Sequence, residues 1–123
     1  MNKLSDFEQI TKLDDNSITA IFELKSDNKW IEGHFEDLPI LPGVAIIFYV
    51  VELSKKYFDV DLGNASLNFD LIKFAKPVLL GSRAMFQINH VSEKSQITFS
   101  IHDIIKGANS DEIFSSGKLK YEI

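Results

Sequence analysis

The chain has 123 residues, a formal net charge of −5 and 45% hydrophobic residues. This length and apolar content fit one domain, residues 1–123, with a core of its own. The acidic charge argues against a nucleic-acid partner, and the absence of cysteine excludes disulfides and thiolate metal sites. The longest apolar run, residues 44–51, is too short to span a membrane, so we expect a soluble, cytoplasmic protein.

The segment before residue 25 predicts mostly β structure. Residues 5–9 are compatible with a short helix. Residues 10–13 and 17–24 predict two strands, because β-favouring residues flank the polar turn at residues 14–16.

One helix is predicted over residues 44–58, a segment too long and too polar at its end to be a strand. Pro42 and Gly43 mark its start. Lys55 and Lys56 suit the negative end of the helix dipole. Apolar residues surround the first two turns, which predicts that this half of the helix is buried on all sides.

The second half of the chain predicts further β structure. Strands are expected over residues 66–78, 83–91 and 96–105, then a loop at 107–111 and a last strand over 112–123. Apolar and polar residues alternate in the strand that begins at residue 96, so one of its faces is buried. The order of elements predicts an α+β domain, in which an antiparallel sheet wraps around a single helix.

The most specific segment is residues 33–43, Gly-His-Phe-Glu-Asp-Leu-Pro-Ile-Leu-Pro-Gly. It places His34 beside a turn braced by Pro39 and Pro42, and the turn leads directly into the predicted helix. The first N–H groups of a helix have no acceptor within it, so they can stabilise a developing negative charge. A histidine, with an ordinary pKa of ~6.5, can accept a proton at neutral pH. The segment therefore predicts a proton-transfer group beside an oxyanion site.

This segment and three others resemble the hot-dog-fold β-hydroxyacyl-acyl carrier protein dehydratases of the FabA/FabZ type. Residues 73–78, Lys-Phe-Ala-Lys-Pro-Val, followed shortly by Gly81, are similar to the second signature of that family. Residues 30–35 and 115–118 are most similar to its small ApeI-like branch, from aryl-polyene-type pathways. The resemblance covers nearly the whole chain. It implies a hot-dog fold around one buried central helix and a hydro-lyase activity that gives a trans-2-enoyl product.

The resemblance also implies catalytic roles. The catalytic histidine of the family matches His34, the base for the C2 proton, and its backbone oxyanion donor matches the Gly43 N–H. The Asp or Glu that the family carries on the central helix, acting across a dimer interface, matches Phe48, which cannot donate a proton. Glu52, one turn further along, occupies a position where the family usually has Gln.

The missing acid leaves four interpretations open. Glu52 could supply the proton, or His34 could return it after taking it from C2. A different subunit of a mixed dimer could bring the acid, or the activity could have been lost.

Further residues are assigned to binding. The expected substrate contacts are Phe35, Ile40, Pro42, Phe48 and Phe74. The basic residues expected to dock an acidic acyl carrier protein are Lys73, Lys76 and Arg83.

The expected partners are acyl carrier protein and, in the simplest case, a second copy of the chain, with a heterodimer as the alternative. Two other functions stay open: an acyl thioesterase in which Glu52 activates water, and a non-catalytic partner subunit. No cofactor is implied. The three histidines give no metal-ligand spacing, and His90 and His102 are expected at surface strand positions.

Overall fold

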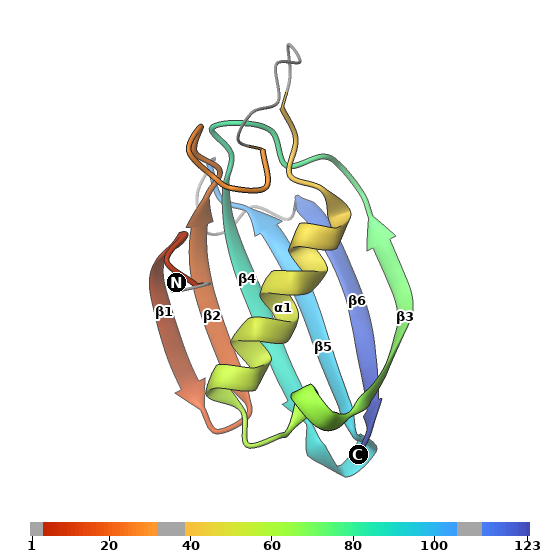
Figure 1. Cartoon of the computed structure of the whole chain (residues 1–123). Helices are drawn as coiled ribbons and strands as arrows, with labels where there is room; N and C mark the ends of the chain where they lie inside the picture. The colour runs from red at the N-terminus through yellow and green to blue at the C-terminus, as the bar shows by residue number, and fades with distance from the viewer. Residues whose placement is uncertain (1–3, 32–38, 106–111) are drawn as a thin grey trace.

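In the computed structural model one helix lies across one face of a six-stranded sheet (Figure 1). The structure describes residues 4–31, 39–105 and 112–123. In chain order the elements are β1 (Phe7–Asp14), β2 (Ser17–Glu23), α1 (Gly43–Tyr57), η1 (Leu62–Asn64), β3 (Ser66–Phe74), β4 (Arg83–Val91), η2 (Ser92–Lys94), β5 (Gln96–Asp103) and β6 (Ile113–Glu122).

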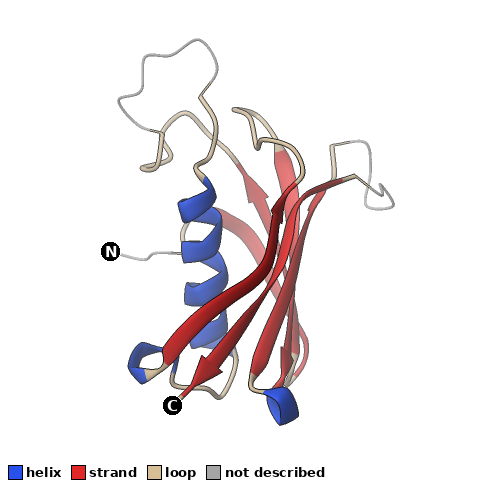
Figure 2. Cartoon of the chain, turned by 90° about the vertical axis from the view of Figure 1, so that its right-hand side faces the viewer, coloured by secondary structure: helices blue, strands red, loops and turns tan. Residues whose placement is uncertain are grey.

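The strands lie in the order β1-β2-β4-β5-β6-β3, and every neighbouring pair is antiparallel. The sheet curves around α1, which occupies its concave side (Figure 2). The chain leaves β2, runs through α1 and returns at the far edge of the sheet as β3. The predicted α+β architecture of one helix and one antiparallel sheet is therefore confirmed.

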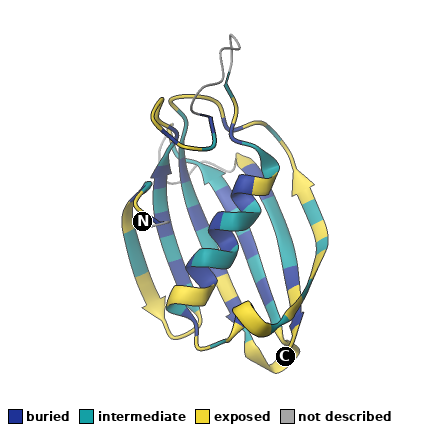
Figure 3. Cartoon of the chain, viewed as in Figure 1, coloured by how far each residue is buried: buried dark blue, intermediate teal, exposed yellow. Residues whose placement is uncertain are grey.

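The core forms where the inner face of the sheet meets α1 (Figure 3). Ile97, Phe99 and Ile101 of β5 are buried, whereas the residues between them are only half-buried, as their alternation predicts. On the helix, Tyr49, Val50 and Leu53 are almost fully buried against the strands. Burial of these apolar side chains is the main force that holds the helix on the sheet.

The short helix expected at residues 5–9 is wrong, because β1 begins at Phe7. The Phe7 ring lies 5.1–5.5 Å from the rings of Phe22, Tyr49 and Phe86. Pairing with β2 and this aromatic packing override a weak local preference. The strand expected over residues 66–78 is also shorter than predicted and ends at Phe74.

The sequence predicted that the first half of α1 is buried on all sides, and this prediction is wrong. Val44 is 65% exposed, and Ile47, Phe48 and Val51 are half-buried. A single sheet covers only one side of a helix. The buried side of α1 is formed by Ala45, Ile46, Tyr49, Val50, Leu53 and Ser54. In one copy of the chain, α1 therefore presents an apolar outer face.

Edge strand β3 is largely exposed and carries a bulge (Figure 3). Leu71 has a positive φ of 54°, and the register with β6 shifts between Asp70 and Lys73. Ile72 turns inward and packs directly on Gly117, where any side chain would collide with it. Leu71 turns outward and is 69% exposed.

His90 is buried, contrary to the prediction of a surface position. Its ring stacks on Phe58 at 5.4 Å, and its Nε2 lies 2.6 Å from the Tyr121 hydroxyl. Burial lowers the pKa of His90 below its ordinary value of 6.5, and the charge of Glu93 opposes this only in part. The inner face of β4 takes every second residue, and His90 continues the buried series of that strand.

Acid should destabilise the fold through His90. The unfolded chain binds this proton more readily than the folded chain, because the lowered pKa belongs to the folded state. The free energy of unfolding should therefore fall as the pH decreases through 6.5 toward the folded-state pKa, and this contribution should be absent well above pH 6.5. Urea unfolding at about pH 7.5 and about pH 5.5 measures the fall. It should be smaller in His90→Gln and unchanged in His102→Gln; an equal fall in all three proteins would contradict this role.

In the part of the chain that the structure describes, no helix has the length and apolar character needed to cross a membrane.

Candidate functional site

The amino end of α1 has no side-chain cap. Pro42 occupies the N-cap position with φ −61° and ψ 147°, and its carbonyl oxygen accepts from the N–H of Ala45 at 2.9 Å. Gly43 and Val44 follow as the first two helical residues, so their N–H groups have no acceptor within the helix. The partial positive charge of the helix is concentrated at this point.

Backbone pairing fixes the approach to this helix end. The Leu41 N–H donates to the Val78 carbonyl at 2.9 Å, and Ile40 forms an isolated bridge with Leu79. The segment before α1 is thus held against the segment that follows β3. The prolines of the first motif and the Lys-Phe-Ala-Lys-Pro-Val motif come together here, although they are far apart in the sequence.

A groove of about 410 Å³ opens beside the helix end. It is lined by Ile40, Leu41, Gly43, Ile46, Phe74, Ala75, Lys76, Pro77 and Val78. Most of these side chains are apolar, so the groove suits an acyl group better than a sugar or a nucleotide. Gly43, whose N–H has no acceptor within the helix, forms part of the wall of this apolar groove.

Lys76 ties the wall of the groove to the sheet. Its Nζ lies 2.6 Å from Asp103 Oδ2 and 2.6 Å from Glu112 Oε2, and 4.9 Å from the centre of the Phe114 ring. The hydrogen bond to Asp103, followed by that to Glu112, raises the pKa of Lys76. Lys76 is therefore engaged within the chain rather than free to meet a partner.

The structure brings some of the predicted site residues together. Gly43, Ile40 and Phe74 line the groove, and Pro42 caps the helix beside it. His34 and Phe35 lie outside the described residues. The sequence did not indicate that Leu41, Ile46 and Val78 complete the apolar lining, because only folding brings these three residues together.

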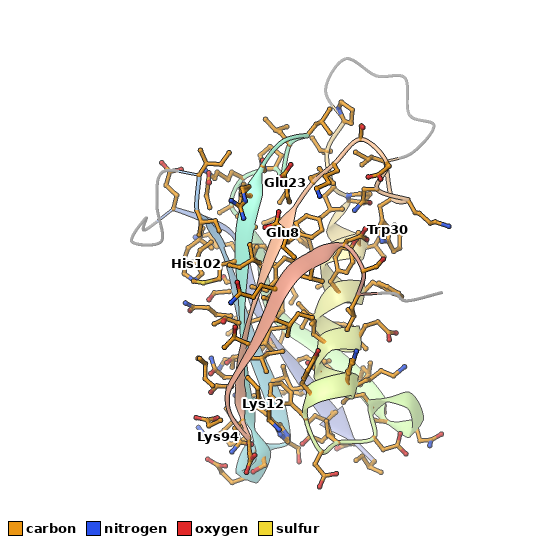
Figure 4. All side chains as sticks on the ribbon, turned by 90° about the vertical axis from the view of Figure 1, so that its left-hand side faces the viewer. Glu8, Lys12, Glu23, Trp30, Lys94 and His102 are labelled. Carbon is orange, nitrogen blue, oxygen red and sulfur yellow. The ribbon has the colours of Figure 1, made fainter. Side chains whose placement is uncertain are left out.

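Phe48 and Glu52 do not join the groove. Phe48 packs on Trp30 with ring centres 5.6 Å apart, and Trp30 lies beside the helix (Figure 4). Glu52 is 16% exposed and lies 3.6 Å from Lys55. It follows Gly43 by nine positions, or about 13 Å along the helix axis. None of the described residues that line the groove is an acid.

Comparison with known proteins assigns the family. The sequence model of the ApeI-like family, described as ApeI dehydratase, matches residues 9–118. The chain belongs to the ApeI-like dehydratase family. The resemblance of its motifs to dehydratases, and to this small branch in particular, is thereby confirmed.

Individual relatives of this ApeI-like chain are distant. The chain is similar to the 3-hydroxyacyl-[acyl-carrier-protein] dehydratases FabZ of Vibrio atlanticus, 28% identical over 104 residues, and of Ehrlichia chaffeensis, 30% identical over 95 residues. These matches cover 79% and 74% of the chain, and it spans 66% of the length of each relative. A solved structure, the dehydratase heterocomplex ApeI:P from Xenorhabdus doucetiae, has a TM-score of 0.77 at 24% identity, covering 94% of this chain and 95% of that one. The hot-dog fold is therefore confirmed.

The other two basic residues predicted for docking differ in their surroundings. Arg83 begins β4, an inner strand, and its Nη2 lies 2.6 Å from Glu8 Oε2. Its Nε lies 4.0 Å from Glu23 Oε1; Glu8 and Glu23 belong to β1 and β2 (Figure 4). Lys73 is exposed on β3, directly before the groove residue Phe74. Of the three, Lys73 alone is exposed, and it adjoins the groove residue Phe74.

A buried hydrogen-bond chain joins α1 to two segments near the amino terminus. The Tyr49 hydroxyl donates to Asp6 at 2.7 Å and accepts from the Asn28 side-chain amide at 3.1 Å. Asn28, which is 3% exposed, also accepts from the Trp30 N–H at 2.8 Å. Burial, and then the bond to Asp6, raises the pKa of Tyr49, so the phenol stays protonated.

Removing the Tyr49 hydroxyl should destabilise this ApeI-like protein. Tyr49→Phe leaves the buried Asn28 amide and the Asp6 carboxylate without this partner, which costs about 1–3 kcal/mol. Tyr57→Phe on the same helix is the control and should change stability by less than about 0.5 kcal/mol. Chemical denaturation measures both variants; similar stability of the two would exclude a role for the chain of bonds.

Proposed function

We propose that the chain is a β-hydroxyacyl-acyl carrier protein dehydratase. It removes water from a β-hydroxyacyl thioester and leaves the trans-2-enoyl thioester. The observation that carries the proposal is the uncapped Gly43 N–H in the wall of an apolar groove, in a chain of a dehydratase family. The FabZ relatives are named 3-hydroxyacyl-[acyl-carrier-protein] dehydratases, which supports acyl carrier protein as the carrier.

Gly43 would stabilise the charge that develops on the thioester oxygen. When the C2 proton leaves, the electron pair moves toward the carbonyl, and the oxygen becomes negative. An N–H at the positive end of a helix binds this oxygen more strongly in the transition state than in the substrate. Such a donor typically lowers the activation free energy by about 3–4 kcal/mol.

His34 would act as the base. It takes the proton from C2, the C2–C3 double bond forms, and the bond between C3 and the hydroxyl oxygen breaks. The hydroxyl needs a proton to leave as water. The described groove lining holds no acid, and Glu52 lies about 13 Å from Gly43 along the helix axis. This favours His34 itself or a residue of a second subunit over Glu52 as the source of the proton.

A second subunit is supported by the surfaces around the groove. Among the strands of the described residues, none pairs with the outer edge of β3, and unpaired strand edges favour association. Phe69 and Leu71 on β3 and Val44 at the start of α1 are exposed apolar residues. Burial of such side chains favours association. We therefore propose that the active form is a dimer formed along β3 and the outer face of α1.

Product analysis by mass spectrometry tests the activity. Purified protein is incubated with β-hydroxyacyl carrier proteins of several chain lengths. Loss of one water with the thioester intact is expected. Release of the free carrier thiol would instead establish a thioesterase, and no conversion at any chain length would contradict an enzyme that acts alone.

A second candidate function is the partner subunit of a mixed dehydratase dimer. Phe48 favours it, since this aromatic residue packs on Trp30 where the family carries an acid. The similar solved structure from Xenorhabdus doucetiae, a dehydratase heterocomplex, offers a precedent for such assembly. If the acid comes from another protein, the purified chain should be inactive and Phe48→Glu should gain activity. Activity of the wild type that is lost in Glu52→Gln would assign the acid to Glu52 instead.

Lys73 should contribute to carrier-protein docking. Lys73→Glu is expected to raise KM several-fold at low salt with little change in kcat, because reversing a rim charge slows association with an acidic partner. Lys94→Glu, at the opposite end of the sheet (Figure 4), is the control and should leave KM unchanged. An unchanged KM for Lys73→Glu at low salt would remove Lys73 from the docking surface.

A further inference from the structure

The ring of Phe74 lies directly on Gly43. A Cβ atom at Gly43 would be 2.8 Å from Phe74 Cζ and 3.1 and 3.3 Å from the two Cε atoms. Real Cβ atoms do not come this close to a ring, so the arrangement exists because residue 43 has no side chain. The ring therefore occupies the space beside the first residue of α1.

The backbone that carries this ring is fixed. Phe74 is the last residue of β3 and is paired with Ser115 of β6. The Ser115 hydroxyl donates to the Lys73 carbonyl at 2.9 Å, and the Ala75 N–H donates to the Phe114 carbonyl at 2.9 Å. The position of the ring thus depends on side-chain rotation alone. Since the ring is 54% exposed, core packing does not account for its presence.

A thioester bound at Gly43 would meet this ring near its reacting carbons. The N and Cβ positions of one residue are ~2.5 Å apart, so Phe74 Cζ is within about 5 Å of the Gly43 nitrogen. An oxygen that accepts from that N–H lies ~2.9 Å from the nitrogen. The carbonyl carbon and C2 follow within two bond lengths, and because Gly43 and Phe74 line the same groove, an acyl group bound there passes the ring.

We infer that Phe74 is the residue that selects against branching at C2. The inference rests on the proposed function, because it places the thioester oxygen on the Gly43 N–H. An unbranched acyl group has two hydrogens on C2, one for the base and one that can face the ring. A methyl branch would compete with the ring for the second position, so the site takes linear β-hydroxyacyl thioesters.

The contact itself has a test that needs no substrate. Alanine is favoured over glycine in a helix, so Gly43→Ala should raise the Tm in a Phe74→Ala background. In the wild type this gain should be smaller or lost, because the new Cβ forces the Phe74 ring to rotate away. Equal Tm changes from Gly43→Ala in both backgrounds would show that the ring does not occupy this space.

The selection is tested with two non-hydrolysable amide analogues of β-hydroxyacyl pantetheine, one linear and one with a 2-methyl branch. The wild type should bind the linear analogue about tenfold more tightly by calorimetry. Phe74→Ala should reduce this preference to less than about threefold, and Phe74→Leu should give an intermediate value. Leu13→Ala, at an exposed position of β1 on the other edge of the sheet, should keep the wild-type preference.

The outcomes separate the inference from the proposed function. A preference that is absent in the wild type, or unchanged in Phe74→Ala, overturns the inference while dehydration by the wild type stands. Failure of the wild type to bind either analogue, together with no dehydration, overturns the proposed function and the inference with it.

Discussion

Replacing His34 with alanine should lower kcat/KM for dehydration by about 10²–10⁴-fold, the usual contribution of a positioned general base. The C2 proton of a thioester is weakly acidic, and without a base at that position water must remove it. KM should change much less than kcat, because the imidazole acts on the proton in the transition state rather than on the bound ground state. Steady-state kinetics on a β-hydroxyacyl carrier protein gives both values.

His102→Ala is the matched control for this experiment. His102 is half-buried, bonds to Ser100 at 2.8 Å and lies on the side of the sheet away from the helix (Figure 4). Its loss should leave kcat/KM within about twofold of the wild type. A His34→Ala variant that keeps more than about a tenth of the wild-type kcat/KM would remove His34 from the role of base.

Gly43→Pro should lower kcat by about 10²–10³-fold, since proline has no N–H to stabilise the thioester oxygen. Proline is favoured at the first position of a helix, so α1 can still begin at this residue. The preceding residue, Pro42, has φ −61° and ψ 147°, the extended conformation that a residue before proline requires. The substitution thus removes the donor while the backbone keeps its course.

Gly43→Ala separates the loss of the N–H from the contact with Phe74. Both variants place a Cβ against the ring, but alanine keeps the donor. The kcat of Gly43→Pro should be at least tenfold below that of Gly43→Ala. Equal kcat values for the two variants would mean that the Gly43 N–H does not stabilise the transition state.

Local sequence patterns were sufficient for most of the fold. The alternation of Ile97, Phe99 and Ile101 with polar residues specified the face of β5, and Pro42 and Gly43 specified where α1 begins. Such signals are local, because a strand repeats every two residues and a helix start requires particular residues.

The errors arose where long-range contacts decide the outcome. The ring of Phe7 packs against the rings of Phe22, Tyr49 and Phe86, which favours a strand at the start of β1 over a helix. His90 is buried because its ring stacks on Phe58 and bonds to the Tyr121 hydroxyl, and both residues are far away in the sequence. The residues that flank Phe7 and His90 in the sequence do not indicate either contact.

The candidate site was predictable in part. The motifs indicated Gly43 and Phe74 separately, and folding brings them into contact. The charge of Lys76 suggested docking, whereas its position between Asp103 and Glu112 assigns it to the wall of the groove. A side chain's charge can be read from the sequence, but the carboxylates that surround it cannot.

The measurement that tests the central claim most directly is hydration in the reverse direction, in water labelled with ¹⁸O. A dehydratase must also add water to its product, so trans-2-enoyl carrier protein is incubated with the wild type and with His34→Ala. The account predicts that the wild type adds one labelled water to C3, that the thioester stays intact, and that His34→Ala adds little or none. Label found in a free carboxylic acid together with the free carrier thiol, or equal hydration by the two proteins, would contradict it.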